Sequence, residues 1–317
     1  MPSAHVPGDA DPGGAPASNG RVGQRAPLAG PAPLVDVHAH FLHARCGRKD
    51  WEARNASRLR ATERIGITAQ VASILGSFGF TSPTYFPSPA DVTMGNDAML
   101  AIQQREPSRV RSYVVVNPND TAHALAEIER CAEQGAVGVK LAASRRADDP
   151  LLDPVAEAAE RHGFPILHHI WQHRTREWPN QEISDAIDLG RLAARHPRVS
   201  FILAHIGGGG DYAHTFPAVE DLGNVYLDLS GSGVDRGMLD DALHAVGAGR
   251  LLWGCDLTME TGLAKLRALE VIGLSPGDME QVRWRNAARI FPPGALPGIP
   301  DVEHERRGTS TSRTEVR

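Results

Sequence analysis

The chain has few cysteines, no long apolar run and no excess of basic residues. Its three cysteines, Cys46, Cys131 and Cys255, are too scattered for a disulfide framework or a CxxC metal knuckle. No apolar run approaches the roughly 20 residues that a membrane-spanning helix needs. The net charge of −5 is spread along the chain, whereas nucleic acid requires a concentrated basic face. We therefore expect a cytoplasmic protein that acts on a small-molecule substrate, with neither nucleic acid nor a membrane as a partner.

The two ends of the chain differ in composition from the part between them. Residues 1–33 are rich in Pro, Gly and Ala and lack the apolar segment of a secretory signal. Such a composition buries too little apolar surface to offset the entropy of ordering, so it predicts a disordered leader. Residues 293–317 are predicted to be a polar tail that frays. Between them, residues 34–292 are long enough for one barrel of roughly 250 residues.

Apolar, β-branched segments recur about every 30 residues, and an amphipathic segment with helical spacing follows each of them. The predicted strands are Leu34–Val37, Gln70–Leu75, Arg111–Val116, Val137–Leu141, Pro165–His168, Val199–Ala204, Val225–Leu229 and Arg250–Trp253. Eight strand–helix units imply a parallel sheet, and eight parallel strands close naturally into a barrel. A doubly wound open sheet is the alternative, but it would want a glycine-rich fingerprint after the first strand. His38-Ala39-His40 occupies that place. The sequence therefore predicts an α/β fold, a (β/α)8 TIM barrel.

Two histidines stand at the end of the first predicted strand. Side chains two positions apart on a strand point the same way, so His38 and His40 should reach one ion together. Two neutral imidazoles suit Zn²⁺ or a similar divalent metal. An isolated pair of this kind is weak support, and it gains force only if other strand ends supply further ligands.

The ends of the other strands do supply candidates. In barrel enzymes the active site lies at the carboxyl ends of the strands. Those ends carry Lys140, His168, His169, His205 and Asp256. Chance rarely gathers so many histidines and carboxylates at one rim.

Longer motifs around these residues point to one family. The motifs are VDVHAHF (35–41), MGNDAMLAIQQREPSRVRSYVVVNPND (94–120), PILHHIW (165–171), FILAHIGGGG (201–210), NVYLDLSG (224–231), LLWGCDLTME (251–260) and WRNAARIF (284–291). Together they span about residues 34–292 and resemble the amidohydrolase superfamily, in its amidohydrolase-related branch. That branch also contains the aminocarboxymuconate-semialdehyde decarboxylase-like enzymes. The resemblance implies a TIM barrel of the metal-dependent hydrolase type and makes a homodimer plausible.

The resemblance also implies a ligand set. The family's strand-one pair falls on His38 and His40, and its strand-eight aspartate falls on Asp256. Its strand-five ligand lies four residues after a proline, which selects His169 and leaves His168 as a core histidine facing the helices. The set would hold one divalent metal, with Zn as the expected ion and Mn or Fe as alternatives.

Two residues of this set carry the predicted chemistry. The resemblance makes His205 catalytic rather than a ligand, able to polarise a carbonyl or shuttle a proton. Asp256 would touch both the metal and its water and could take the proton of that water. A bound divalent ion can lower the pKa of its water from 15.7 to about 7.

Other polar residues at the rim are weaker candidates. Lys140 could be carboxylated and bridge two metals, as in binuclear relatives, but we prefer a contact with an anionic substrate or an ion pair. Asp36 should share the face of His38 at a deeper level, where a structural ion pair is expected rather than ligation. Gly207–Gly210 could cradle a phosphate, although a tight turn beside the site is the preferred interpretation.

One connection is long and aromatic. Residues 76–90 contain Phe78, Phe80, Tyr85 and Phe86, which could form a wall over the barrel mouth. A satellite cluster or a subunit contact is the alternative. With Trp171, which the family's decarboxylases also carry in the pattern His-x-Trp, Phe78 and Phe80 are candidate contacts for a flat or unsaturated substrate.

Three functions are compatible with these residues. The preferred one is a metal-dependent hydrolase that attacks an ester, lactone or amide with metal-activated water. The alternative is a metal-dependent non-oxidative decarboxylase of an aromatic or unsaturated acid, which Trp171 and the aromatic loop favour. The modest barrel length and the lack of a clear carboxylate-binding Arg pair favour the hydrolase, because the helix with Arg54, Arg58 and Arg60 should carry at least two of them to solvent. A barrel that binds a metabolite without turnover is the third, and the intact ligand set argues against it.

Overall fold

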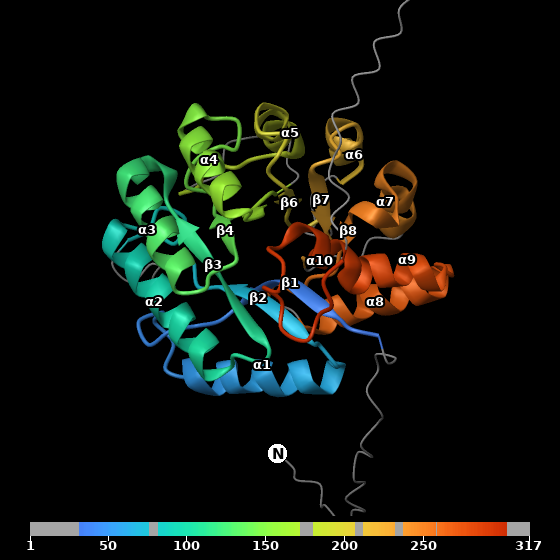
Figure 1. Cartoon of the computed structure of the whole chain (residues 1–317), viewed down its shortest axis with the longest axis horizontal. Coiled ribbons are helices and arrows are strands. Elements are labelled where there is room, and N and C mark those ends of the chain that lie inside the picture. Colours follow the sequence, from blue (N-terminus) through green and yellow to red (C-terminus); the bar gives the residue numbers. More distant parts are fainter. Residues whose placement is uncertain are drawn as a thin grey trace, which may run out of the picture.

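The computed structural model describes residues 32–75, 82–171, 180–206, 212–231, 237–257 and 259–302. Strands alternate with helices, and the helices surround the strands (Figure 1). The strands are β1 (Val35–His40), β2 (Ala69–Ser73), β3 (Val110–Val116), β4 (Gly138–Leu141), β5 (Ile166–His168), β6 (Phe201–Leu203), β7 (Val225–Asp228) and β8 (Leu251–Leu252). The α-helices are α1 (Trp51–Ile65), α2 (Pro89–Arg105), α3 (Thr121–Glu133), α4 (Asp153–His162), α5 (Ala186–Arg195), α6 (Thr215–Val219), α7 (Met238–Val246), α8 (Met259–Ile272), α9 (Pro276–Glu280) and α10 (Asn286–Ile290). None of the helices in these ranges is long and apolar enough to cross a membrane.

The eight strands form one parallel sheet in the order β1 to β8, and this sheet nearly closes on itself. Among the described residues, two backbone–backbone hydrogen bonds cross the seam between β1 and the segment after β8: Val37 N donates to Trp253 O (3.1 Å), and Asp256 N donates to His38 O (2.6 Å). An isolated parallel bridge between Ala39 and Asp256 continues the same seam. The predicted (β/α)8 barrel is confirmed.

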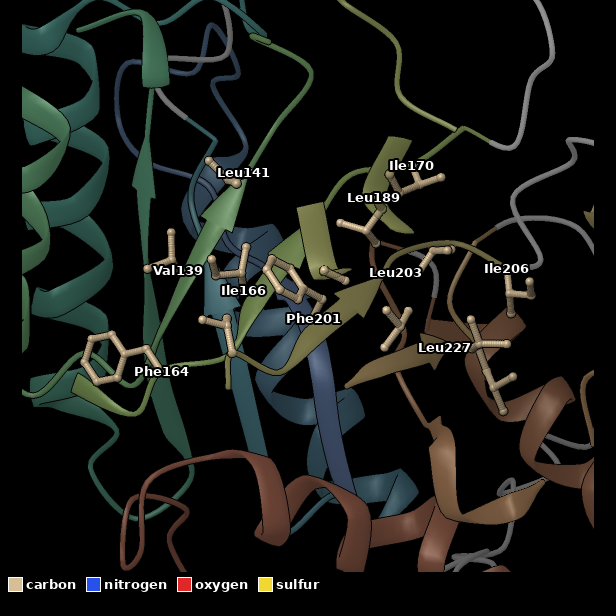
Figure 2. Packing of buried hydrophobic residues seen from close by; sticks show 14 of the residues in the cluster. Val139, Leu141, Phe164, Ile166, Ile170, Leu189, Phe201, Leu203, Ile206 and Leu227 are labelled. Atoms are coloured by element: carbon tan, nitrogen blue, oxygen red, sulfur yellow. The ribbon is translucent and has the colours of Figure 1, made fainter. Parts of the chain in front are cut away.

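Successive side chains along a strand point alternately into the barrel and outward toward the helices. Apolar residues such as Val139, Phe201 and Leu227 point outward and pack in the layer between strands and helices (Figure 2). Their strand neighbours, Lys140 and Asp228 among them, therefore face inward. Both are fully buried, so two charged groups lie inside the barrel wall.

A β-bulge in β1 changes this alternation where the histidines begin. Between Asp36 and Ala39 the register of β1 shifts by one residue against β2. Val37 packs in the interior cluster below the site, and His38 and His40 then face the interior as well. Bulges are known to re-aim side chains beside active sites. The Tyr113 hydroxyl donates to Val37 O (2.8 Å) and so satisfies a carbonyl in the bulge.

The bulge overturns one expectation about Asp36. Because one extra residue separates the two halves of β1, Asp36 does not share the face of His38 but points outward toward α1. There it forms the structural ion pair that we expected, with Arg58 (2.8 Å). Burial raises the pKa of Asp36 to about 6, against the opposing effect of the Arg58 charge.

Candidate metal centre and active site

The two histidines of β1 face each other at the carboxyl end of the barrel. His38 Nε2 lies 3.1 Å from His40 Nε2. The opposite nitrogen of each ring is engaged: His38 Nδ1 donates to Asp228 (2.7 Å), and His40 Nδ1 donates to the carbonyl of Ser73 (3.2 Å). Burial, together with the nearby charge of Lys140, lowers the pKa of both rings well below 6.5. Both are therefore neutral, and their Nε2 lone pairs point at the same space, as a shared cation requires.

Asp256 joins this pair from the end of the barrel's last strand. Its Oδ1 lies 3.3 Å from His40 Nε2, and its Oδ2 lies 3.7 Å from His205 Nδ1. The ligand atoms of His38, His40 and Asp256 all lie within 4.8 Å of one another. Two imidazoles and one carboxylate suit Zn²⁺, Mn²⁺ or Fe²⁺, so the donor set fits one divalent ion.

The fourth predicted ligand, His169, lies at the same rim but outside that compact group. Its Nδ1 is 2.9 Å from His205 Nε2. Its Nε2 is buried and has no hydrogen-bond partner among the described residues, which leaves this nitrogen available to a ligand. Its ring lies against Trp171, with centroids 4.5 Å apart and planes at 86°. The ligand role of His169 stays a prediction.

His168 occupies the other face of β5. It is fully buried, and its Nδ1 donates to the carbonyl of His169 (2.9 Å). It stands two residues after Ile166, which packs against the helices. Burial lowers the pKa of His168 to about 4, so it is a neutral core histidine.

His205, the predicted catalytic histidine, stands at the centre of a ring cluster. Its centroid is 4.7 Å from that of His38, and Trp171 stacks over it at 6.3 Å with planes at 21°. Its Nδ1 also approaches Ser230 Oγ (3.3 Å). Burial, together with neighbouring basic groups that include Lys140, lowers the pKa of His205 well below 6.5. His205 and Asp256 both have left-handed backbones, with φ of 63° and 54°.

Asp228 is a site residue that the sequence analysis did not single out. Its Oδ2 accepts from His38 Nδ1, and its Oδ1 accepts from the Ser230 backbone N–H (2.9 Å). The Ser230 hydroxyl donates to the same carboxylate. A carboxylate behind a ligating histidine fixes the tautomer and orientation of the ring. The signal was present, because Asp228 ends β7 as the other site residues end theirs.

The backbone of Gly254 packs closely against Asp228 and His38, and leaves no room for a side chain. An ideal Cβ at this position would lie 2.3 Å from Asp228 Oδ1 and 3.0 Å from His38 Cβ. Gly254→Ala should therefore displace both groups and weaken binding of a divalent ion by about 10- to 100-fold. The dissociation constant is measured by competition with a chromogenic chelator. Gly249→Ala is the matched control, because its Cβ would meet nothing within 4 Å; equal affinities in the two variants would contradict the argument.

Lys140 lies inside the barrel next to the histidines. Its Nζ is 3.0 Å from His38 Nε2, and the side chain is fully buried. Burial lowers the pKa of Lys140 to about 8. The structure thus brings Lys140 into the site, while its contact with an anionic substrate stays a prediction. Phe78, Phe80 and Gly207–Gly210 lie outside the described residues.

A basic cavity opens beside His40. Its volume is about 510 Å³, and the arginines that line it are Arg48, Arg54, Arg58 and Arg64. Of the helix arginines, Arg54 and Arg60 are exposed as expected, whereas Arg58 is buried. Glu260 is the acidic residue in the lining, so the cavity has an excess of positive charge next to a candidate metal ligand.

The fold of the chain is similar to that of several solved structures. Similar solved structures include 2,6-dihydroxybenzoate decarboxylase from Rhizobium, at 18% identity and a TM-score of 0.64 over 82% of this chain and 98% of that one. Another is 5-carboxyvanillate decarboxylase LigW from Sphingomonas paucimobilis, at 18% identity and a TM-score of 0.60 over 82% and 99%. A third is dihydroxybenzoic acid decarboxylase from Polaromonas sp. JS666 with bound manganese and an inhibitor, 2-nitroresorcinol, at 18% identity and a TM-score of 0.62 over 82% and 96%. At 18% identity, these similarities show that the chain has the same fold as the three structures.

None of the curated proteins compared with the chain matches it. The family model described as amidohydrolase matches residues 35–292, which is most of the chain. This range contains every histidine, aspartate and lysine of the site described above. As the sequence motifs implied, the chain belongs to the amidohydrolase family.

Proposed function

We propose that the protein is a metal-dependent non-oxidative decarboxylase of an aromatic or unsaturated acid. The observation that carries this proposal is that aromatic side chains border the site. Trp171 stacks over His205, and Tyr85 lies beside His169 with centroids 5.7 Å apart, so planar rings border the candidate ligands. The three similar structures named above are decarboxylases, and all three carry the names of aromatic acids.

The basic cavity supports an acid as the substrate. Arg48 and Arg54 are paired with Asp50, and Arg58 is paired with Asp36. The four lining arginines still outnumber these carboxylates and Glu260, so a carboxylate that approaches His40 meets a positive potential. The sequence analysis weighed the lack of a clear arginine pair in favour of a hydrolase. The cavity weakens that objection, because Arg48, Arg54 and Arg64 line it beside His40.

The chain's own residues suit a proton-transfer role. When bound, a divalent ion would supply Lewis acidity toward the oxygen atoms of the substrate. Asp228 holds His38 in the tautomer whose Nε2 carries no proton. His205 and Asp256, 3.7 Å apart, can pass a proton between them and toward the substrate. The bond from the ring or vinyl carbon to the carboxylate breaks, its electron pair stays on that carbon, CO₂ leaves, and the proton forms the new C–H bond.

Hydrolysis of an ester, lactone or amide uses the same residues and is the function to be distinguished. The test incubates the protein with 2,6-dihydroxybenzoate and 5-carboxyvanillate, and in parallel with small lactones, in the presence of Mn²⁺ or Zn²⁺. We expect CO₂ release, one deuterium in the organic product in D₂O, and no ¹⁸O in that product in labelled water. Lactone opening with ¹⁸O incorporation, and no CO₂ from either acid, would replace the decarboxylase by the hydrolase.

A further inference from the structure

A buried ion pair lies on the outer side of the barrel wall, directly behind the metal ligands. Arg58 of α1 donates from Nη2 to Asp36 Oδ2 of β1 at 2.8 Å. Their side chains are 7% and 0% exposed. A buried pair of this kind is not in itself a reason for stability, because desolvating both charges offsets their attraction. The other contacts of the two side chains are therefore informative.

The second carboxylate oxygen of Asp36, which Arg58 does not contact, accepts hydrogen bonds from backbone N–H groups on both sides of the seam. Asp36 Oδ1 accepts from the N–H of His38 (3.1 Å) and from the N–H of Cys255 (3.0 Å). His38 lies in the β-bulge, where the regular strand pairing is interrupted, and Cys255 precedes Asp256. One carboxylate oxygen thus ties the bulge of β1 to the end of the last strand.

The guanidinium completes this arrangement. Arg58 Nη1 donates to the carbonyl of Asp256 at 2.7 Å, while Nε donates to Gln70 Oε1 at 3.3 Å. Asp256 has a left-handed backbone, which is uncommon for a residue other than glycine. Arg58 supplies one of the bonds that hold it.

We propose that Asp36 and Arg58 are positioning residues of the metal centre. Together they fix the backbone of His38, Cys255 and Asp256 so that the ligand atoms of β1 and of the last strand meet on one ion. Neither side chain touches the space where the Nε2 atoms converge, because both lie on the outer face of the wall. The inference rests on the metal centre of the proposed function and is independent of the reaction that the centre catalyses.

The test uses two conservative substitutions. Arg58→Lys keeps the charge but loses the planar fork that reaches three acceptors. Asp36→Asn keeps a carbonyl oxygen for the backbone N–H groups but loses the ion pair. For each variant, the dissociation constant of Mn²⁺ or Zn²⁺ is measured on the full chain by competition with a chromogenic chelator. The thermal midpoint of the metal-free protein is measured beside it.

We expect both variants to bind the ion about 10- to 100-fold more weakly, the loss typical for residues that orient ligands. Because the two residues act as one unit, the double variant should lose about as much as either single one. Excess metal should restore the activity of both. A merely structural pair would lower the thermal midpoint and leave the dissociation constant unchanged.

The control is Glu127→Gln. Glu127 of α3 is a buried carboxylate, and its bonds run to Asn96 (2.9 Å) and Arg130 (2.8 Å) of the outer helices. This variant should lower stability without changing metal affinity. Metal affinity within twofold of wild type in Asp36→Asn and Arg58→Lys would overturn the proposal, as would an equal loss in Glu127→Gln. If Arg58→Lys does not fold, Asp36→Asn alone decides. Metal binding without decarboxylation would refute the proposed function and leave this inference intact.

Discussion

Replacing His38 by alanine will remove the bound divalent ion and lower kcat/KM by about 10³-fold or more. His38 provides one of the two facing Nε2 atoms and is the candidate ligand that Asp228 orients. Loss of a Lewis acid is worth several kcal/mol of transition-state stabilisation, and each 1.4 kcal/mol is a factor of ten in rate. Metal analysis of the purified wild-type protein should find about one ion per chain, with none retained in His38→Ala.

Two further variants complete this experiment. Asp256→Ala should lose the ion as well, because its carboxylate belongs to the same compact group. Asp228→Asn should retain it with an affinity reduced by about 10- to 100-fold, since it removes the orienting charge and no ligand. Full occupancy in both His38→Ala and Asp256→Ala would show that the ligand assignment is wrong.

His205→Asn will keep the metal and lose activity by about 10²- to 10⁴-fold, the usual contribution of a general acid or base. Asparagine suits this position because it tolerates the left-handed backbone of His205, with φ of 63°. It can also retain a hydrogen bond to Ser230, which lies 3.3 Å from His205 Nδ1. It cannot take up and release a proton.

The readouts are metal content, CO₂ release and deuterium incorporation into the product. Loss of the ion in His205→Asn would move this residue among the ligands, and unchanged activity would remove it from the mechanism. Gln281→Asn, at a half-buried position between α9 and α10 that bonds to Arg289, provides a control for a change to asparagine away from the site.

Much of the fold was predictable because its signals are local and repeated. Strand and helix periodicity predicted the eight strand–helix units. The rule that barrel active sites lie at the carboxyl ends of the strands placed Lys140, His205 and Asp256 at one rim. The bulge in β1 was not predictable. It inserts one residue without altering composition, so a strict period of two placed Asp36 on the wrong face.

The parts of the site that were missed depend on contacts distant in sequence. Asp228 matters because it meets His38 from 190 residues away. Arg58 looked like one of several helix arginines, and its burial follows from a carboxylate and a carbonyl on two separate strands. The motifs did not separate hydrolase from decarboxylase, since both use the same five residues. The order of preference changed with the basic cavity, the stacked rings and the similar solved structures.

The seam between β1 and the end of the last strand has a consequence for folding. The candidate ligands His38 and His40 lie on one side of it and Asp256 on the other, and few backbone hydrogen bonds cross it. An ion held by all three would act as a cross-link between the first and last strands of the barrel, and binding would stabilise the closed form by mass action. Removal of the metal would then lower the stability of the folded barrel as well as its activity.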